Sequence, residues 1–125
     1  MPTPTEIRLN RAEKVLHVVF DTGEAFALPA EYLRVESPSA EVQGHGPGQR
    51  VIVPGRRHVG IMKVEPVGNY AVRLVFDDLH DTGIYSWDIL LRLGRERAER
   101  WAEYERALAA KGLSRDPPAR RPAGA

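Results

Sequence analysis

Three carboxylates and one imidazole lie within five residues of this 125-residue chain, the densest group of side chains here that could do chemistry. Asp77, Asp78, His80 and Asp81 supply the oxygen and nitrogen ligands that divalent cations bind. The competing interpretation is a loop between a strand and a helix, whose carboxylates cap backbone N–H groups and favour the N-terminus of the next helix. The residues alone leave both interpretations open.

The chain has three further histidines, His17, His45 and His58. His17 lies in an apolar strand pattern and is interpreted as lining a sheet face. His58 follows two arginines in a loop, where we expect it to be solvated. His45 lies in a polar, glycine-rich loop, so a divalent metal held by His45 and His80 is an alternative to a protein without a cofactor.

The motifs of well-known enzyme sites are missing. The chain has no cysteine, which excludes disulfides, thiolate zinc sites and cysteine nucleophiles. It contains no Gly-x-Ser-x-Gly elbow, and "GHGPGQR" lacks the Lys-Ser/Thr ending of a phosphate-binding loop. Because no nucleophile–base pair can be named, we expect no enzymatic activity.

The net charge of +1 is unevenly distributed along the chain. The first 91 residues hold nine basic and twelve acidic side chains, and the remainder holds nine basic and five acidic ones. This excess is small beside that of nucleic-acid-binding proteins, so we interpret it as a solvated helix and tail and expect no nucleic-acid partner. No apolar run approaches the roughly 20 residues of a membrane span, and the N-terminus lacks a signal-peptide pattern. We therefore expect a cytoplasmic protein with no membrane partner.

Hydrophobic periodicity predicts an α+β fold, a small antiparallel β-sheet of about five to six strands with C-terminal helices, in a single domain. Strands are expected at 6–10, 14–20, 24–29, 50–53, 60–67 and 69–76, a helical turn at 29–37, and helices at 86–94 and 95–112. The domain spans 1–111. The Pro-, Ala- and Arg-rich residues 112–125 are expected to be a disordered, dispensable tail.

Particular residues are predicted to shape these elements. Ser86 is a helix N-cap and Gly94 a helix stop, and Gly68-Asn69 turns a hairpin. One hairpin face is expected to enter the core, and one helix stripe is expected to be apolar. The hairpin face comprises Tyr70, Val72, Leu74 and Phe76, the stripe comprises Ala98, Trp101, Ala102, Leu108 and Ala109, and Trp87 and Trp101 are the expected core anchors.

Two blocks of sequence resemble a known family. "LPAEYLRVESPSAEVQGHG" and "VEPVGNYAVRLVFDDLHDTGIYSWDIL" are similar to the gamma-butyrobetaine-hydroxylase-like N-terminal domain, a small bacterial domain of unknown function. The resemblance extends from about Glu6 to Trp101. It implies a relationship to the zinc-binding N-terminal part of carnitine-biosynthesis hydroxylases, and to domains attached to P-loop iron–sulfur carrier proteins.

The resemblance also implies that a zinc site has degenerated. In the hydroxylases three cysteines follow a Leu-Arg pair and a histidine comes later; here these positions fall on Ser37, Ser39, Val42 and His80. Only one of the four ligands is kept, whereas structural zinc takes four thiolate or imidazole donors. We therefore expect no metal. Instead, the serine hydroxyls and His80 should hold the 37–45 loop by hydrogen bonds or close packing.

The function expected from these observations is that of a free-standing, non-catalytic interaction or accessory domain. The expected partner is a protein, with a P-loop iron–sulfur carrier or an oxygenase as candidates implied by the resemblance. Two alternatives stay open: a metal-binding or iron–sulfur-assembly accessory that uses His45, His80 and the nearby aspartates, and an enzyme related to the carnitine-biosynthesis hydroxylases, whose catalytic domain this sequence does not contain. The candidate interaction surface comprises Ser37, Ser39, Gln43, His45, Arg56, Arg57, His58, Asp77, Asp78, His80 and Asp81.

Overall fold

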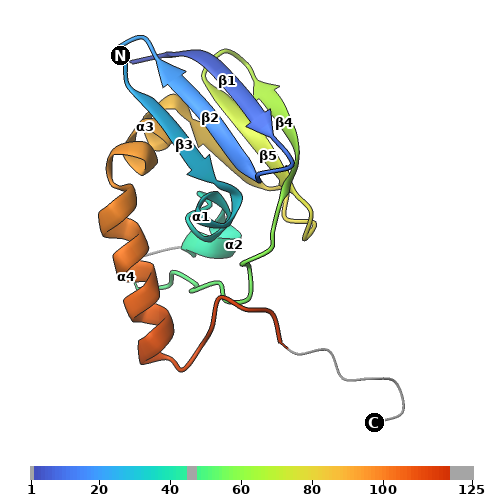
Figure 1. The fold of residues 1–125 in the computed structure, drawn as a ribbon, viewed down its shortest axis with the longest axis vertical. Coiled ribbons are helices and arrows are strands. Elements are labelled where there is room, and N and C mark those ends of the chain that lie inside the picture. The colour runs from blue at the N-terminus through green and yellow to red at the C-terminus, as the bar shows by residue number, and fades with distance from the viewer. Residues whose placement is uncertain (1, 45–47, 119–125) are drawn as a thin grey trace.

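The computed structural model describes residues 2–44 and 48–118, which form two three-stranded antiparallel sheets and four helices (Figure 1). The first sheet has the order β1-β2-β3, with β1 Pro4–Asn10, β2 Val15–Phe20 and β3 Ala25–Pro29. The second has the order β4-β5-β6, with β4 Ile61–Val67, β5 Ala71–Phe76 and β6 Gly83–Ser86. The prediction of an α+β fold with about six strands and C-terminal helices is confirmed.

The main core is built from both sheets. Leu16, Val18 and Phe20 alternate along β2, and their side chains are almost fully buried. Leu74 and Phe76 of β5 belong to the same apolar cluster, together with residues of α1 and α3. A period-two apolar pattern therefore places one face of each sheet in a shared core.

The helices lie at one end and along one side of the sheets (Figure 1). They are α1 Ala30–Val35, α2 Ala40–Gln43, α3 Trp87–Arg95 and α4 Arg97–Ala110. Ser86 caps α3, because its side chain accepts a hydrogen bond from the Ile89 N–H, and this prediction is confirmed. None of the helices in the described part of the chain is long and apolar enough to cross a bilayer.

One predicted strand is absent from the structure, and one strand of the structure was not predicted. Residues 50–53 form no strand but run as an irregular segment, in which Val53 is buried. The sequence analysis also missed β6, which pairs with β5 so that Val72 lies opposite Tyr85. β6 has only four residues and runs directly into the helix capped by Ser86, so it is too short to give a clear strand pattern.

The prediction that Gly94 ends a helix is wrong, because Gly94 lies inside α3. A Cβ atom at this position would lie 2.6 Å from ring carbons of Phe26 in β3. A glycine is required here because the backbone of the helix packs closely against an aromatic ring. Its role is therefore set by a tertiary contact and not by helix capping.

The predicted apolar faces are only partly correct. Tyr70 is 57% exposed and does not enter the core, although the other three residues of its hairpin face do. On α4 the buried residues are Tyr104 and Leu108, while Ala98 and Ala109 are exposed. The buried stripe is thus rotated toward Tyr104, whose hydroxyl donates to the Val53 carbonyl oxygen at 2.6 Å.

The expectation of a disordered tail from Gly112 does not hold for residues 113–116. The backbone N–H of Gly55 donates to the Ser114 carbonyl, and that of Arg57 donates to the Arg115 carbonyl. The Arg115 guanidinium makes two hydrogen bonds to the buried Glu31 carboxylate, at 2.7 and 2.8 Å, and lies 4.9 Å from the centre of the Trp101 ring. An ion pair and a cation–π contact thus hold this segment against the domain, although it contains few apolar side chains. Residues 119–125 lie outside the described part of the chain.

Candidate functional site

His80 joins two loops that are far apart in the sequence. Its Nε2 lies 2.9 Å from Ser37 Oγ, and its Nδ1 lies 3.1 Å from a carboxylate oxygen of Glu41. A carboxylate can only accept, so the neutral ring donates from Nδ1 to Glu41 and accepts from the Ser37 hydroxyl at Nε2. The prediction that His80 bonds to the 37–45 loop is confirmed, and Glu41 is a partner that the sequence analysis missed.

Ser39 makes a second connection between the same loops. Its hydroxyl lies 2.7 Å from the hydroxyl of Thr82. The same side chain caps α2 by accepting from the Glu41 N–H. The Ser39 N–H in turn donates to Ser37 Oγ at 3.3 Å. Hydrogen bonds therefore hold the 37–44 and 77–82 segments together.

Val42, another position that the resemblance relates to a zinc ligand, packs in an apolar cluster. It lies in a second apolar cluster with Val35, Val53, Tyr104 and Leu108. Its side chain is almost fully buried, so it contributes to packing between α2 and α4. The side chain at this position therefore makes apolar contacts and has no atom that could bind a metal ion.

Two arginines bind Asp78 at the base of the 77–82 loop. Asp78 Oδ2 accepts from Arg34 Nε at 2.8 Å and from Arg56 Nε at 2.6 Å, and Oδ1 accepts from the backbone N–H of His80 at 3.2 Å. Burial alone would raise the pKa of the Asp78 carboxyl, but these hydrogen bonds and the charge of Arg34 lower it overall. Arg34 is itself buried, and its NH1 atom has no hydrogen-bond partner in the described part of the chain.

The pKa of His80 is lowered below its usual value of 6.5. Burial is the largest cause and the charge of Arg34 is the next, while Glu41 and Asp78 act in the opposite direction. The imidazole is only 5% exposed and is neutral at physiological pH. Both of its nitrogens are taken by this chain's own side chains.

The loop between β5 and β6 is closed tightly at Leu79. The Phe76 N–H donates to the His80 carbonyl at 3.0 Å, and the Leu79 N–H donates to the Phe76 carbonyl at 3.1 Å. Leu79 has φ 72°, in the left-handed region, and its side chain is 84% exposed. A bulky residue rarely adopts this conformation. The sequence analysis assigned no role to Leu79.

The hypothesis of a cation site formed by Asp77, Asp78, His80 and Asp81 is wrong. Across residues 2–44 and 48–118 no three or more histidine, cysteine or acidic side chains are grouped so that they could hold a metal ion. Asp78 is directed to two arginines and His80 to Ser37 and Glu41, whereas the other two aspartates are exposed. The alternative pair of His45 with His80 cannot be placed, since His45 lies outside the described residues.

The residues predicted to form an interaction surface fall into two groups. Ser37, Ser39 and His80 are buried and cannot contact a partner directly, so their assignment to the surface is corrected. The accessible members lie on two adjacent segments, 55–60 and 77–82, which we term the paired-loop surface. Its members from the predicted set are Arg56, Arg57, His58, Asp77, Asp78 and Asp81. Gln43 does not belong to it, because this residue is half-buried and its amide donates to the Ser37 carbonyl at 2.8 Å.

The two segments of the paired-loop surface are joined directly. The Asp77 N–H donates to the Gly60 carbonyl at 2.9 Å, and Arg56 reaches Asp78. A shallow cavity of about 190 Å³ lies between them, lined by Gly55, Arg56, His58, Val59, Asp77 and Asp78.

The family model described as gamma-butyrobetaine hydroxylase-like, N-terminal, matches residues 7–91, which include the His80 site and both loops. The chain belongs to this family. No curated protein matches the chain. The expected family assignment is thus confirmed, and it brings no assigned biochemical activity with it.

Solved structures share the fold along most of the chain. Two structures determined by NMR in solution have TM-scores of 0.83 and 0.80, at 46% and 44% sequence identity. The matches cover 96% and 100% of this chain, and 94% and 93% of those chains. A crystal structure of a protein of unknown function from Acidithiobacillus ferrooxidans, of the DUF971 family, matches with TM-score 0.63 and 41% identity over 74% of this chain and 92% of that one.

Proposed function

We propose that this chain is a non-catalytic docking module that binds a protein partner through the paired-loop surface. The observation that carries the proposal is the state of His80. Both ring nitrogens of this buried histidine are engaged by Ser37 and Glu41, so the one imidazole at the former zinc site serves as a structural tie. A general base or a metal ligand needs a free nitrogen that faces a ligand.

The arrangement of the two loops supports docking. Arg34 and Arg56 fix Asp78, and the histidine and Ser39 fix the other end of the 77–82 loop. A surface held in this way loses little conformational entropy when a partner binds, which favours affinity. The residues that remain accessible, including His58, Asp77 and Asp81, are polar or charged and suit recognition rather than catalysis.

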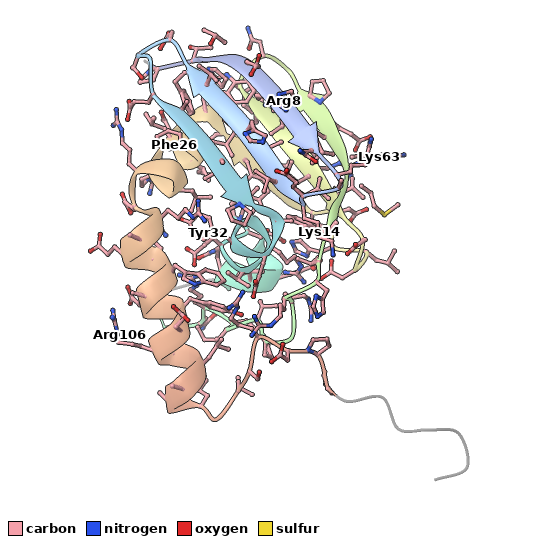
Figure 2. All side chains as sticks on the ribbon, viewed as in Figure 1. Arg8, Lys14, Phe26, Tyr32, Lys63 and Arg106 are labelled. Atoms are coloured by element: carbon pink, nitrogen blue, oxygen red, sulfur yellow. The ribbon has the colours of Figure 1, made fainter. Side chains whose placement is uncertain are left out.

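The candidate partners are a P-loop iron–sulfur carrier or an oxygenase, because similar domains are attached to such proteins. The test is isothermal titration of the purified full chain against the purified carrier and oxygenase of the same cell, together with chemical cross-linking in that cell. We expect one of these proteins to bind. A double variant, Asp77→Lys with His58→Glu, should weaken that binding, whereas Arg106→Glu on the exposed face of α4 should not (Figure 2).

Two outcomes would contradict the proposal. One is the absence of any protein complex, by titration and by cross-linking. The other is stoichiometric iron or zinc in the purified chain that His80→Ala removes, which would favour the metal or iron–sulfur accessory function instead.

A further inference from the structure

We propose that Leu79 is the apolar anchor of the paired-loop surface, and that it inserts into an apolar pocket of the partner protein bordered by lysine or arginine side chains. This inference rests on the proposed docking function and specifies its partner chemistry. It follows from the exposure, the backbone conformation and the surroundings of Leu79.

Leu79 is exposed far more than any other large apolar side chain in the described part of the chain. It is 84% accessible, whereas the other exposed ones, Val51, Met62, Tyr70, Ile84 and Leu113, lie between 40% and 57%. A single exposed leucine is common on protein surfaces and carries no argument by itself. The backbone at this position supplies the second observation.

The backbone of Leu79 has φ 72°, a conformation in which a leucine is disfavoured and a glycine or an asparagine is not. A leucine at this position contributes nothing to the core, and it does not lower the energy of the positive-φ backbone. Residues held in such conformations concentrate at functional sites, because the surrounding structure must maintain them. The side chain is therefore better explained by a contact outside this chain than by the stability of the fold.

The loop around Leu79 is held firmly on both sides. Before it, Asp78 accepts hydrogen bonds from Arg34 and Arg56. After it, the ring of His80 is bound by Ser37 and Glu41. The apolar side chain thus projects from a base that does not need to become ordered on binding, which is the property of an interface anchor.

Charge indicates the chemistry of the partner. Asp77 and Asp81 flank the anchor in the sequence, and both are exposed. Neither forms an ion pair within 4.0 Å of a described residue, although the charge of Asp81 contributes to raising the pKa of Arg73. The neighbouring arginines are already engaged: Arg56 binds Asp78 and the Pro54 carbonyl, and Arg57 binds Asp116. A pocket with a basic border would complement these two exposed carboxylates and accept the leucine between them.

The test uses the full chain in three variants. Leu79→Asn removes the apolar group but tolerates positive φ, so the fold should stay as stable as in the parent. Asp77→Asn with Asp81→Asn removes the flanking charges. The matched control is Tyr70→Ser, which removes an exposed apolar side chain at the opposite end of the β4–β5 hairpin.

A photo-cross-linking amino acid placed at position 79, and separately at position 70, first captures the partner in the cell of origin. The captured protein is then purified and titrated against each variant. We expect capture at 79 and not at 70, at least a tenfold higher Kd for Leu79→Asn, and a Kd within twofold of the parent for Tyr70→Ser. The double aspartate variant should bind more weakly at low salt and show a smaller salt dependence than the parent.

The outcomes separate this inference from the proposed function. If the partner binds Leu79→Asn as tightly as the parent, the anchor assignment is overturned while docking stands. If no partner is captured and none binds by titration, both are overturned. Sedimentation of the purified chain gives a further outcome: a dimer that Leu79→Asn disperses would assign Leu79 to a second copy of this chain and overturn the basic-pocket assignment. Leu79→Gly repeats the titration with a residue that adopts positive φ freely, in case the asparagine alters folding.

Discussion

The Nε2 atom of His80 lies 2.9 Å from the hydroxyl oxygen of Ser37, a residue 43 positions earlier in the chain. The resemblance to the hydroxylases relates both positions to zinc ligands, and in this chain a hydrogen bond joins them. A neutral hydrogen bond between two buried side chains contributes much less to folding than a structural zinc ion does. The loop therefore needs its other ties, from Ser39 and Glu41, to stay in place.

Replacement of His80 by alanine should loosen the 37–44 segment without unfolding the sheets. The substitution leaves the buried Ser37 hydroxyl without the acceptor for its proton, while its oxygen still accepts from the Ser39 N–H, at a cost of about 1–3 kcal/mol. Amide hydrogen exchange should rise in this segment and stay slow in β2 and β5. His58→Ala, at an exposed position, should change the free energy of unfolding by no more than about 0.5 kcal/mol. Uniform exchange changes across the whole protein would contradict a local role.

The stability of the protein should depend on pH through His80. The folded state lowers the pKa of this imidazole, mainly by burial, so the unfolded state takes up the proton first as the pH falls below about 6.5. The free energy of unfolding should therefore decrease from pH 7.5 to pH 5.5, until the pKa of the folded state is passed. Urea titrations of the parent and of His80→Gln should diverge in this way. An equal pH dependence in both proteins would show that His80 does not contribute.

Arg115 should stabilise the fold, contrary to the expectation that residues from Gly112 onward are dispensable. Arg115→Ala leaves the buried Glu31 carboxylate without its bidentate partner and removes the guanidinium from the Trp101 ring, and it should cost about 1–3 kcal/mol. Arg106→Ala is the matched control, because Arg106 projects away from α4 (Figure 2). Truncation after Lys111 should lower the melting temperature at least as much as Arg115→Ala. A truncated chain that melts with the parent would restore the earlier expectation.

Trp101 should stabilise the fold more than Trp87 does. Trp101 contacts both apolar clusters, and its ring centre lies 5.1 Å from that of Tyr104 and 6.3 Å from that of Tyr32. Trp101→Ala should cost roughly 3 kcal/mol, the lower end of the range for buried tryptophans, because the ring is half-buried. Trp87 is also half-buried, and its indole N–H donates to the Asn69 carbonyl. Trp87→Ala should cost less, and the opposite order in denaturant unfolding would contradict these assignments.

Zinc should be absent from the purified protein in stoichiometric amounts. Ser37 and Ser39 are engaged in hydrogen bonds, and Val42 is packed in a core. Elemental analysis should find far less than one zinc per chain, and a chelator should leave the melting temperature unchanged. One zinc per chain, with a lower melting temperature after chelation, would contradict this prediction.

The local patterns of the sequence determined the elements with strong periodicity. Leu16, Val18 and Phe20 alternate as buried strand residues, and Ser86 marks the start of α3. These features depend on neighbours in the chain, because side-chain direction and capping are set within a few residues. The resemblance of two sequence blocks to the family also predicted that His80 lies beside the 37–45 loop, and its contact with Ser37 confirms this.

Tertiary structure decided the features that depend on contacts between distant residues. The sequence pattern predicts a helix stop at Gly94, but the close approach of the Phe26 ring determines the role of this glycine. Arg115 lies in a segment with a disordered composition, yet Glu31 and Trp101 bind it from 84 and 14 residues away in the chain. The exposure of Leu79 could not be predicted either, because an apolar residue in a loop gives no periodic signal. Such pairings form only when the chain closes on itself, and single-sequence periodicity carries no information about which segments then meet.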